Sequence, residues 1–517
     1  MRVPRLSCSL IALAIAAAAC GSDGPGTSVR VALAYDDALG LDTAEVTLGD
    51  RTLSAPIEHE LLLLVPDDAA GSEMPIAVWG RKEERRAAYG TATAVPVRGK
   101  TVAADLSLTA CTPGCNGDML TTCTGEPRSC QLGCSEDGDA HCLAPSASNG
   151  VDPTLADTLA GTTMISGATT LFDTDTGTIT GGITRAPGQG INNGIMYAQA
   201  PPSGPGGAPL AIFAFHNLTI DGGAGVRITG SRAAVLLVGD TAGIAGVIDV
   251  SGGGFTRSSA GPGGGAGGTV STQAGGCSAG AAGGHGTLAG PTDDGGGGGG
   301  GGGVTGAPGG GRLPAIVGMG GAACLPPLLE PLQGGSGGGR GGGPSGQAAA
   351  GGGGGGALQI TAVRVLVLTG TITAGGMGGD SGALSAVDPG AGAGGGAGGA
   401  VLLEAPMLTI AGSAILAANG GGGGGGGGDI MESNMAGADG GAGDQSALGG
   451  QGTRDDNGGG TGGALASPPD VGRDAETNGN AGGGGGASGR IVLRGHARLV
   501  SGKISPQPTI MDVKPPS

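Results

Sequence analysis

The sequence contains the stretch Val235-Leu236-Leu237-Val238, followed by Ile244-Ala245-Gly246 and Val247-Ile248-Asp249. The apolar runs in this stretch are only a few residues long, and small or turn-forming residues separate them. Such runs are too short for helices and suit β-strands, with glycine marking the corners between them. The stretch therefore predicts two or three short strands joined by tight corners.

The same pattern occurs five times along the chain. Its copies begin at Leu210, Val235, Leu358, Val401 and Ile491. In each copy a marker glycine follows the first apolar residue after 11 or 12 positions. The first two copies begin 25 positions apart (235 − 210) with nothing inserted between them. One such coil cannot bury its own apolar face, whereas stacked coils share a continuous core.

Residues 210–506 are therefore predicted to form a right-handed parallel β-helix, similar to the pectin-lyase-like β-helices. Neighbouring coils would lie at the usual strand spacing of roughly 4.8 Å. This arrangement places Val235, Leu358, Val401 and Ile491 directly above one another. An ordinary β-sandwich with similar strands is the alternative.

Three long insertions interrupt the repeat at the same point in the coil, just after the strand that follows the marker glycine. They span residues 253–356, 377–399 and 421–488. Because solenoids place such insertions on one face, we expect all three to lie side by side along one edge of the stack. The insertions contain unbroken glycine runs, at residues 295–303, 351–356, 420–428 and 482–486.

The glycine-rich insertions have two physical alternatives. A free glycine-rich chain is a flexible coil, since glycine loses the most conformational entropy on ordering. Polyglycine also adopts the extended three-residue helix of polyproline II, in which bare Cα positions let neighbours pack closely. The tracts resemble the Gly-Gly-x tracts of glycine-rich mycobacterial surface proteins. Neighbouring insertion points favour partial order, which a disulfide between Cys277 and Cys324 would support.

The composition excludes several classes of protein. The chain has 517 residues, of which 125 are Gly, one is Trp, three are Tyr and four are Phe. A large aromatic core is thus excluded, whereas a solenoid with a thin aliphatic core is compatible. The formal net charge of −17 argues against nucleic acid as a partner, because phosphate contacts need clustered Lys and Arg.

The N-terminus has the organisation of a secretion signal. Arg2 and Arg5 form a charged start, residues 6–16 form a short apolar segment, and small residues follow. This segment is too short to span a bilayer permanently, and it matches a cleaved signal peptide. Residues 1–19 are therefore predicted to be removed on export.

A lipid anchor is expected at the cleavage point. The sequence Ala17-Ala18-Ala19-Cys20 followed by Gly21-Ser22 resembles the lipobox of bacterial lipoproteins, although Ala17 stands where Leu is usual. The resemblance implies that Cys20 is lipid-modified and that residues 20–27 form a tether. By the rule for enteric bacteria, the absence of Asp at position 21 implies an outer-membrane lipoprotein, facing the periplasm or the cell surface.

Residues 28–109 are predicted to form a small β-sandwich. Short runs such as 29–35 and 102–108 alternate in polarity with period two, and turn residues separate them. The region resembles the immunoglobulin- or transthyretin-like modules that lift surface proteins off a membrane. We expect Trp79 to be a core residue of this sandwich.

Residues 110–143 are predicted to form a disulfide-rich module. The unit Cys-x-x-Gly-Cys, then seven residues and Cys, occurs twice, at Cys111, Cys115, Cys123, Cys130, Cys134 and Cys142. In an exported chain six such cysteines imply three disulfides, with fifteen pairings open. The cysteine density resembles EGF-like modules. A zinc cluster is the competing interpretation, but His141 is the single nearby histidine, and we expect no metal and no cofactor.

The two ends of the β-helix need protection. Residues 144–209 are assigned as a transition that caps the open end, because unpaired strand edges template aggregation. At the other end residues 507–517 are expected to form a frayed tail, since Pro506, Pro508, Pro515 and Pro516 oppose strand pairing.

The search for catalytic groups gives no candidate. The alignment places Val238, Thr361, Glu404 and Arg494 at equivalent positions, and matches Asp249 with Thr373, Leu416 and Ser505. No carboxylate pair recurs on adjacent coils, as polysaccharide lyases and hydrolases would need. The run from Gly375 to Asp380 matches the start of a calcium-binding nonapeptide, but no tandem copy follows.

The sequence therefore predicts a non-catalytic, lipid-anchored envelope protein that displays a glycine-rich β-solenoid in an adhesive or structural role. Its expected partners are the membrane, through the lipid anchor, and glycans or other surface proteins. The alternative is a carbohydrate-binding or polysaccharide-cleaving β-helix protein at the envelope.

Overall fold

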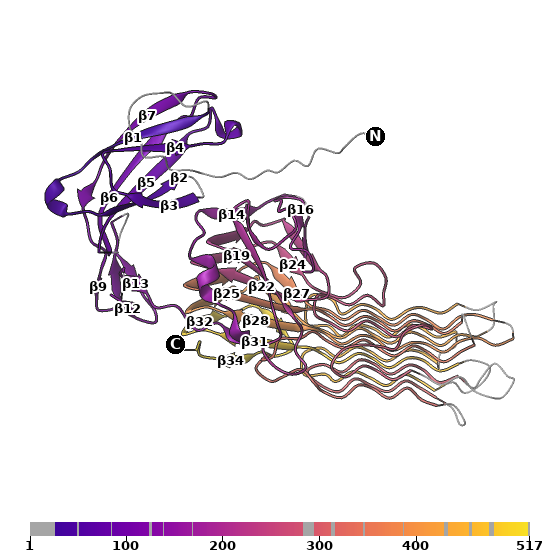
Figure 1. Cartoon of the computed structure of the whole chain (residues 1–517). Helices are drawn as coiled ribbons and strands as arrows, with labels where there is room; N and C mark the ends of the chain where they lie inside the picture. The colour runs from indigo at the N-terminus through magenta and orange to yellow at the C-terminus, as the bar shows by residue number, and fades with distance from the viewer. Residues whose placement is uncertain are drawn as a thin grey trace, which may run out of the picture. The chain divides into compact units, whose positions relative to one another are not determined.

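A computed structural model describes residues 26–514 and shows a nearly all-β protein (Figure 1). It excludes several short internal stretches, at residues 49–50, 84, 124–126, 138, 168, 283–293, 312–315, 345–346, 386, 429–432, 454–456 and 475–479. The chain forms two compact units that divide between Leu143 and Ala144. The predicted signal peptide, Cys20 and most of the tether lie outside the described residues.

The first unit begins with two facing β-sheets. One sheet has the order β4-β1-β7 and the other the order β3-β2-β5-β6-β8. Their strands are β1 (Ser28–Ala34), β2 (Thr43–Leu48), β3 (Arg51–Pro56), β4 (Glu60–Leu64), β5 (Met74–Lys82), β6 (Arg85–Ala94), β7 (Thr101–Ser107) and β8 (Thr109–Ala110). Val29 and Leu63 from one sheet share a buried cluster with Val46 and Val78 from the other, as the period-two alternation predicts. Strand β3 was not predicted from the sequence.

Trp79 is not a core residue, and this prediction was wrong. On β5 the side chains of Ile76 and Val78 are buried, so Trp79 points to the opposite face by simple alternation. There its ring packs against Tyr89, with 4.4 Å between ring centroids, and the Arg86 guanidinium lies 4.7 Å from the Trp79 ring.

The cysteine segment forms two small antiparallel sheets. Their strands are β9 (Gly114–Asn116), β10 (Met119–Thr121) and β11 (Arg128–Ser129), then β12 (Cys134–Ser135) and β13 (His141–Cys142). Three disulfides hold the segment together, and they join Cys111 to Cys123, Cys115 to Cys134 and Cys130 to Cys142. The structure thus selects one of the fifteen pairings.

The second unit contains three stacked sheets whose repeat strands all run parallel. The first comprises β14 (Thr162–Ile165), β20 (Asn217–Ile220), β23 (Thr241–Ile244), β26 (Val365–Leu368), β29 (Met407–Ile410) and β32 (Ala497–Val500). The second comprises β16 (Ile179–Thr180), β15 (Thr170–Asp173), β21 (Gly225–Thr229), β24 (Val247–Asp249), β27 (Thr371–Thr373), β30 (Ile415–Ala417) and β33 (Lys503–Ser505). The third comprises β17 (Gly190–Asn192), β18 (Ile195–Ala200), β19 (Leu210–Phe215), β22 (Ala233–Val238), β25 (Ala357–Ala362), β28 (Ala400–Glu404), β31 (Arg490–Arg494) and β34 (Thr509–Met511). Each predicted coil supplies one strand to each sheet, which is a parallel β-helix.

The predicted stacking is confirmed, with one correction in register. Leu358, Val401 and Ile491 pair in line, but their partner on β22 is Ala234 rather than Val235. The prediction aligned the first large apolar residue of each copy, but strand β22 already begins at Ala233. The predicted register of β22 was therefore shifted by one residue. A shift of one residue exchanges the two faces of a strand. Leu236 therefore faces the interior core, and Val235 faces the outer surface of the same sheet.

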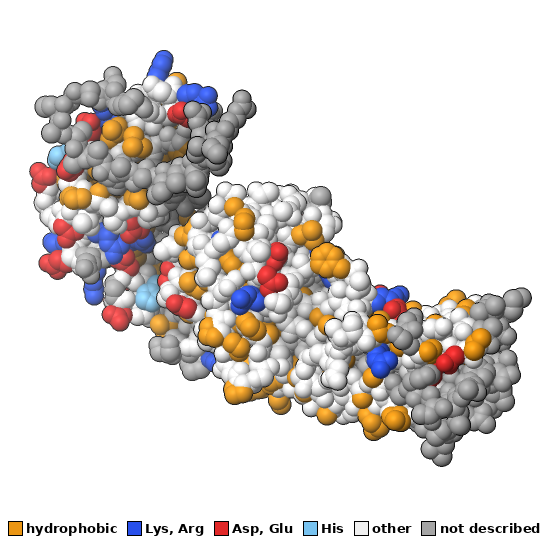
Figure 2. Space-filling view, turned by 45° about the vertical axis from the view of Figure 1, so that its right-hand side comes forward, with side chains coloured by type: hydrophobic (Ala, Val, Ile, Leu, Met, Phe, Trp, Pro, Cys, Tyr) orange, Lys and Arg blue, Asp and Glu red, His pale blue; other side chains and the backbone are white. Residues whose placement is uncertain are grey.

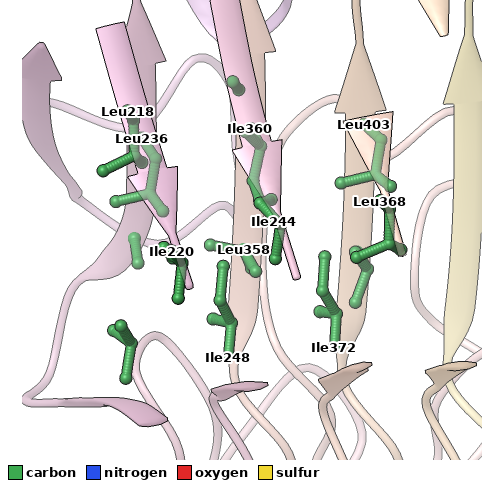
Figure 3. Close-up of a cluster of buried hydrophobic side chains, with 14 of the residues drawn as sticks. Leu218, Ile220, Leu236, Ile244, Ile248, Leu358, Ile360, Leu368, Ile372 and Leu403 are labelled. Carbon is green, nitrogen blue, oxygen red and sulfur yellow. The ribbon is translucent and has the colours of Figure 1, made fainter. Parts of the chain in front are cut away.

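The interior of the β-helix is a set of aliphatic columns (Figure 3). Ile248, Ile372, Leu416 and Ile504 pair successively on the second sheet and form one such column. Leu236 and Ile360 belong to a second column on the third sheet. Because every coil supplies equivalent apolar residues, stacking buries them without large aromatic side chains.

Further strands extend all three sheets before the first coil, and one strand extends the third sheet after the last coil. Before the first coil, β14 and β15 pair with β20 and β21, and β18 pairs antiparallel with β19. These strands fall within residues 144–209, where the capping segment was expected. The expected fraying after Pro506 was wrong, because β34 pairs with β31 beyond two prolines. Those prolines lie before the paired residues Thr509–Met511, so no ladder donor is lost there.

Candidate functional site

The three glycine-rich insertions lie side by side as extended segments (Figure 1). They leave the coils after β24, β27 and β30 and return before β25, β28 and β31, as the insertion points predicted. Backbone hydrogen bonds connect all three insertions; for example, the Gly297 N–H donates to Gly392 O, and the Gly424 N–H donates to Ala393 O. We call the described residues of the three insertions the glycine bundle.

The hydrogen bonds of the bundle repeat every third residue. In the segment 419–427, the N–H groups of Gly421, Gly424 and Gly427 donate to one neighbour, at the carbonyls of Gly396, Ala393 and Gly390. The N–H groups of the other two positions in each turn donate to two further segments, residues 435–438 and 457–463. Three more segments donate hydrogen bonds to the carbonyls of 419–427, namely residues 376–382, 450–453 and 480–486. A period of three with no internal hydrogen bonds is the polyproline II helix. This segment therefore has six neighbours.

Glycine is needed in the bundle for space rather than for an unusual backbone angle. No glycine of the run 420–428 has a positive φ. A Cβ on Gly423 would lie 2.0 Å from Gly483 O, and one on Gly424 would lie 1.9 Å from Asp380 O. Such contacts are impossible without moving a neighbouring backbone. By contrast, a Cβ on Gly441, in the turn after residues 435–440, would meet no atom within 4 Å.

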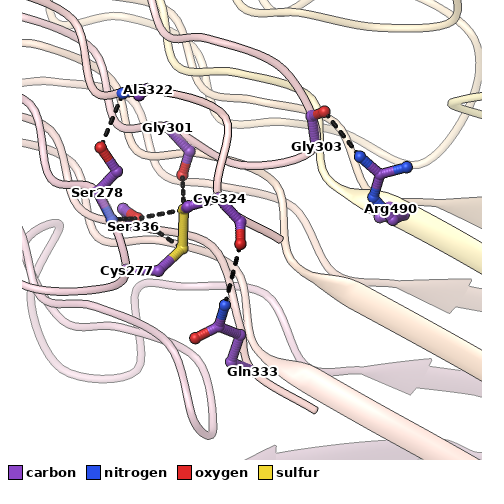
Figure 4. The surroundings of a disulfide bond; sticks show 9 residues. All are labelled: Cys277, Ser278, Gly301, Gly303, Ala322, Cys324, Gln333, Ser336 and Arg490. Atoms are coloured by element: carbon purple, nitrogen blue, oxygen red, sulfur yellow. Dashed lines mark hydrogen bonds between the residues drawn. A yellow bond between two sulfur atoms is a disulfide. The ribbon is translucent and has the colours of Figure 1, made fainter. Parts of the chain in front are cut away.

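A disulfide fixes the longest insertion near its base (Figure 4). It joins Cys277 to Cys324 across a separation of 47 residues. The Ser336 Oγ lies 3.5 Å from Cys277 Sγ, and Gln333 Nε2 donates to Cys324 O at 3.3 Å. The disulfide therefore joins the segments that carry Cys277 and Cys324, and both cysteines also contact the segment at residues 333–336.

Single apolar side chains are distributed over the surface of the bundle (Figure 2). Ile316 and Met319, three residues apart, are 69% and 65% exposed, while Gly318 between them is buried. Met435 and Leu448 are exposed in the same way on neighbouring segments. The three-residue helix thus points one residue of each turn outward, so the surface position can carry a large side chain while the inward positions stay mostly glycine.

A recess lies in this surface, at the hairpin formed by residues 261–276. It has a volume of about 510 Å³, and its lining includes the turn residues Thr269, Val270 and Thr272, the facing residue Ala281, and Arg340. Sequence reasoning did not identify this recess, because it depends on where one hairpin stops within the bundle.

The polar column on the β-helix forms a buried network rather than an open catalytic site. Thr361, Glu404 and Arg494 are aligned as predicted, but their partner on β22 is Leu237, not Val238. Glu404 is 3% exposed and Arg494 is 2% exposed. Thr361 Oγ1 donates to Glu404 Oε2 at 2.8 Å, and Gln359 Nε2 donates to the same oxygen at 3.0 Å.

Segments from outside the repeat cover this column. Ser148 donates to Glu404, while Arg494 forms an ion pair with Glu330. Asn149 Nδ2 donates to Gln359 Oε1 at 3.0 Å. The network therefore fastens the capping region and the loop around Glu330 to the outer face of the third sheet. Polar residues at equivalent positions of otherwise apolar strands were the only sequence signal for it.

The remaining acidic candidates have protein partners. The Asp249 carboxylate forms an ion pair with Arg227. In the strand register Asp249 pairs with Thr373, and Thr373 pairs with Ala417 rather than with the predicted Leu416. Burial raises the pKa of Asp380, and Arg257, at 3.6 Å, offsets part of this effect. Gly376 and Gly379, in the nonapeptide-like run, donate to Asn419 O and Gly422 O as ordinary bundle residues.

Two kinds of site, a cluster of metal ligands and a membrane-spanning helix, are not found in the part of the chain that the structure describes. No group of three or more His, Cys, Asp and Glu side chains could hold a metal ion among these residues. Glu136 Oε1 instead accepts a hydrogen bond from the Cys115 N–H, and Asp139 forms ion pairs with Arg81 and Arg86. No described helix is long and apolar enough to cross a membrane.

The molecule is thus a mainly-β protein with a disulfide cluster and a parallel β-helix, and its disulfides are typical of extracytoplasmic proteins. Comparison with protein-family models, with curated proteins and with solved structures found no match.

Proposed function

We propose that this protein is a non-catalytic component of a bacterial cell envelope, anchored by lipid at Cys20, which displays the glycine bundle for adhesion or for surface structure. The Ala17-Ala18-Ala19-Cys20 sequence supports the anchor. Four disulfides support export, because such bonds persist in oxidising compartments.

The observation that carries the proposal is the backbone lattice of the bundle. Ordering glycine has a larger entropic cost than ordering any other residue, yet the segment 419–427 is hydrogen-bonded to six neighbours. A Cβ added at most glycines inside the lattice would meet a neighbouring backbone. What the lattice provides is a rigid, extended surface from which single side chains project, which suits contact with a large partner.

The anchor is tested with the full chain expressed in a Gram-negative host. We expect incorporation of a radiolabelled fatty acid, recovery in the outer-membrane fraction, and accessibility to protease on whole cells. Cys20→Ser is expected to abolish labelling and to release the exported protein from the membrane. Equal labelling of the variant would reject the anchor, and protection of the wild type from protease would reject surface display.

Adhesion is tested by comparing attachment of cells that express the wild-type chain with cells that carry an empty vector. Gly423→Ala, which places a Cβ against Gly483 O, is expected to reduce attachment, whereas Gly441→Ala is expected to retain it. Surface amounts are equalised by antibody labelling. If wild-type and empty-vector cells attach and aggregate equally, the adhesive role is rejected.

A second candidate function is carbohydrate binding without cleavage, and the recess at Arg340 favours it. Polysaccharide cleavage has less support, because Glu404, a carboxylate aligned with a cation on the next coil, is covered by Ser148 and 3% exposed. A cleaving site needs carboxylates that reach the glycosidic bond of a substrate.

A further inference from the structure

The recess in the glycine bundle is a place where the backbone lattice is incomplete. Along the segment 334–343, the N–H of Gly334 donates to Gly263 O, and three residues later the N–H of Gly337 donates to Gly275 O. The next position in the same row is Arg340. Its backbone nitrogen lies beside Gly268, where the hairpin is about to reverse, so the neighbouring segment ends there.

Arg340 consequently has unused donors. Within the described parts of the chain no acceptor pairs with its backbone N–H, and no carboxylate or carbonyl pairs with its guanidinium. Arg340 is partly exposed and lines the recess. A planar guanidinium with free donors matches a carboxylate or a similar anion in a two-point contact.

The opposite wall of the recess offers weaker polar groups and a small apolar surface. The turn 269–272 presents three hydroxyl side chains, from Thr269, Ser271 and Thr272, and Gln273 follows with an exposed amide. Thr269 Oγ1 accepts the N–H groups of Ser271 and Thr272 and contacts both of their hydroxyls. A hydroxyl has one donor and two acceptor positions, so the outer two hydroxyls retain capacity for a ligand.

We propose that this recess binds a carboxylate-bearing saccharide, with the acid group on Arg340 and sugar hydroxyls on the turn 269–273. A volume of about 510 Å³ is within the range of small-molecule sites, roughly 300–1,000 Å³, and far exceeds an inorganic anion. Val270 is 60% exposed and offers apolar contact to a sugar ring. This assignment rests on the proposed role in surface display and names the chemistry that the surface recognises.

The overall negative charge of the chain argues against non-specific binding of an acidic saccharide. With a formal net charge of −17, the protein repels polyanions at long range. Saturable binding of an acidic saccharide must therefore come from a local contact rather than from general electrostatic attraction. Arg340 supplies such a contact within a wall of glycine and alanine backbone, where competing carboxylates are scarce in the described residues.

The test uses the full chain with Cys20→Ser, which can be purified without lipid, and isothermal titration with trigalacturonate. A neutral galactose trisaccharide serves as the comparison ligand. We expect trigalacturonate to bind and the neutral sugar to bind at least tenfold more weakly. Arg340→Gln is expected to weaken trigalacturonate binding about tenfold or more, the effect of losing a charge-assisted contact. The affinity of Arg340→Lys for trigalacturonate is expected to lie between those of the wild type and Arg340→Gln.

Lys503→Gln is the matched control, because Lys503 is an exposed cation on β33, away from the recess. Gln273→Ala provides a second variant whose exposed side chain cannot disturb the bundle, and we expect it to weaken binding several-fold. Failure of the wild type to bind, equal affinity for the neutral sugar, or unchanged affinity in both Arg340→Gln and Gln273→Ala would each overturn the proposal.

The same variants separate this inference from the proposed function. If cells attach through the protein but the purified chain does not bind trigalacturonate, the saccharide site is wrong and the adhesive role stands. If the purified chain binds trigalacturonate through Arg340 but cells gain no attachment, the site stands and the adhesive role is wrong.

Discussion

Glu404 and Arg494 occupy paired positions on neighbouring coils, with 3.5 Å between Glu404 Oε1 and Arg494 Nη1. Ser148, from the capping region, lies between them; it accepts a hydrogen bond from Arg494 and donates one to Glu404. The pair therefore joins two coils of the β-helix to a segment more than two hundred residues away in sequence.

Arg494→Met is predicted to destabilise the second unit by about 3–5 kcal/mol, because it leaves a buried carboxylate without its countercharge. Chemical unfolding followed by circular dichroism measures this. Trp79, the single tryptophan, lies in the first unit, so its fluorescence reports that unit separately. The control is Asp512→Asn, which breaks the exposed ion pair with Arg498 and should change stability by less than about 1 kcal/mol. Equal effects of the two substitutions would contradict the structural role of the buried pair.

Gly423→Ala is predicted to disorder the bundle around it, since the added Cβ lies 2.0 Å from a backbone oxygen. Overpacking of a close-packed interior costs typically 1–3 kcal/mol, and here the obstacle is backbone that cannot rotate away. Hydrogen exchange of residues 480–486 and 457–463, the direct neighbours of Gly423, should accelerate. Gly441→Ala, with open space at its Cβ, should change neither exchange nor stability by more than about 0.5 kcal/mol.

The stacking of the β-helix could be predicted from the sequence because each coil repeats the same apolar positions. Its register could not be fixed for β22, where Ala233 and Ala234 precede the large residues and were not counted as strand. Trp79 was misplaced for a related reason: a large apolar side chain was assigned to the core by residue type, whereas alternation along β5 decides which face it occupies.

Long-range features were beyond the sequence pattern. The glycine runs indicated close packing, but which segment neighbours which depends on where each hairpin turns. The recess at Arg340 exists because the hairpin 261–276 reverses before the neighbouring segment 334–343 ends. In the same way, Ser148 and Glu330 meet Arg494 only because two loops without repeat signals cover one sheet.

Replacement of both Cys277 and Cys324 by Ser is predicted to destabilise the glycine bundle by about 4 kcal/mol, the chain-entropy value for a closed loop of 47 residues. Limited proteolysis should then cut within the longest insertion at lower protease concentration than in the wild type. Removing the pair Cys111 and Cys123, which closes only 12 residues in the first unit, should leave that cleavage unchanged. Unaltered protease resistance in the first variant would mean that the lattice is sufficient without the bridge.

Glu330 is predicted to make the second unit sensitive to acid. Burial alone would raise the pKa of Glu330, but hydrogen bonds from Lys514, at 2.6 Å, and from Arg494 outweigh burial and hold the pKa below its ordinary value near 4.5. A carboxyl group whose pKa is lower in the folded state contributes stability above the unfolded value and loses it as the pH falls through the folded value.

The free energy of unfolding of the second unit should therefore begin to fall as the pH drops past about 4.5, and Glu330→Gln should remove part of that decline. At pH 7 the variant should be less stable than the wild type, and the difference should shrink as the pH falls through the lowered folded-state pKa of Glu330. Other carboxylates also contribute to acid unfolding, so the informative quantity is the difference between the two curves. If the difference does not narrow as the pH falls, Glu330 stabilises the unit by packing alone, because only an ionised carboxylate can lose its contribution on protonation.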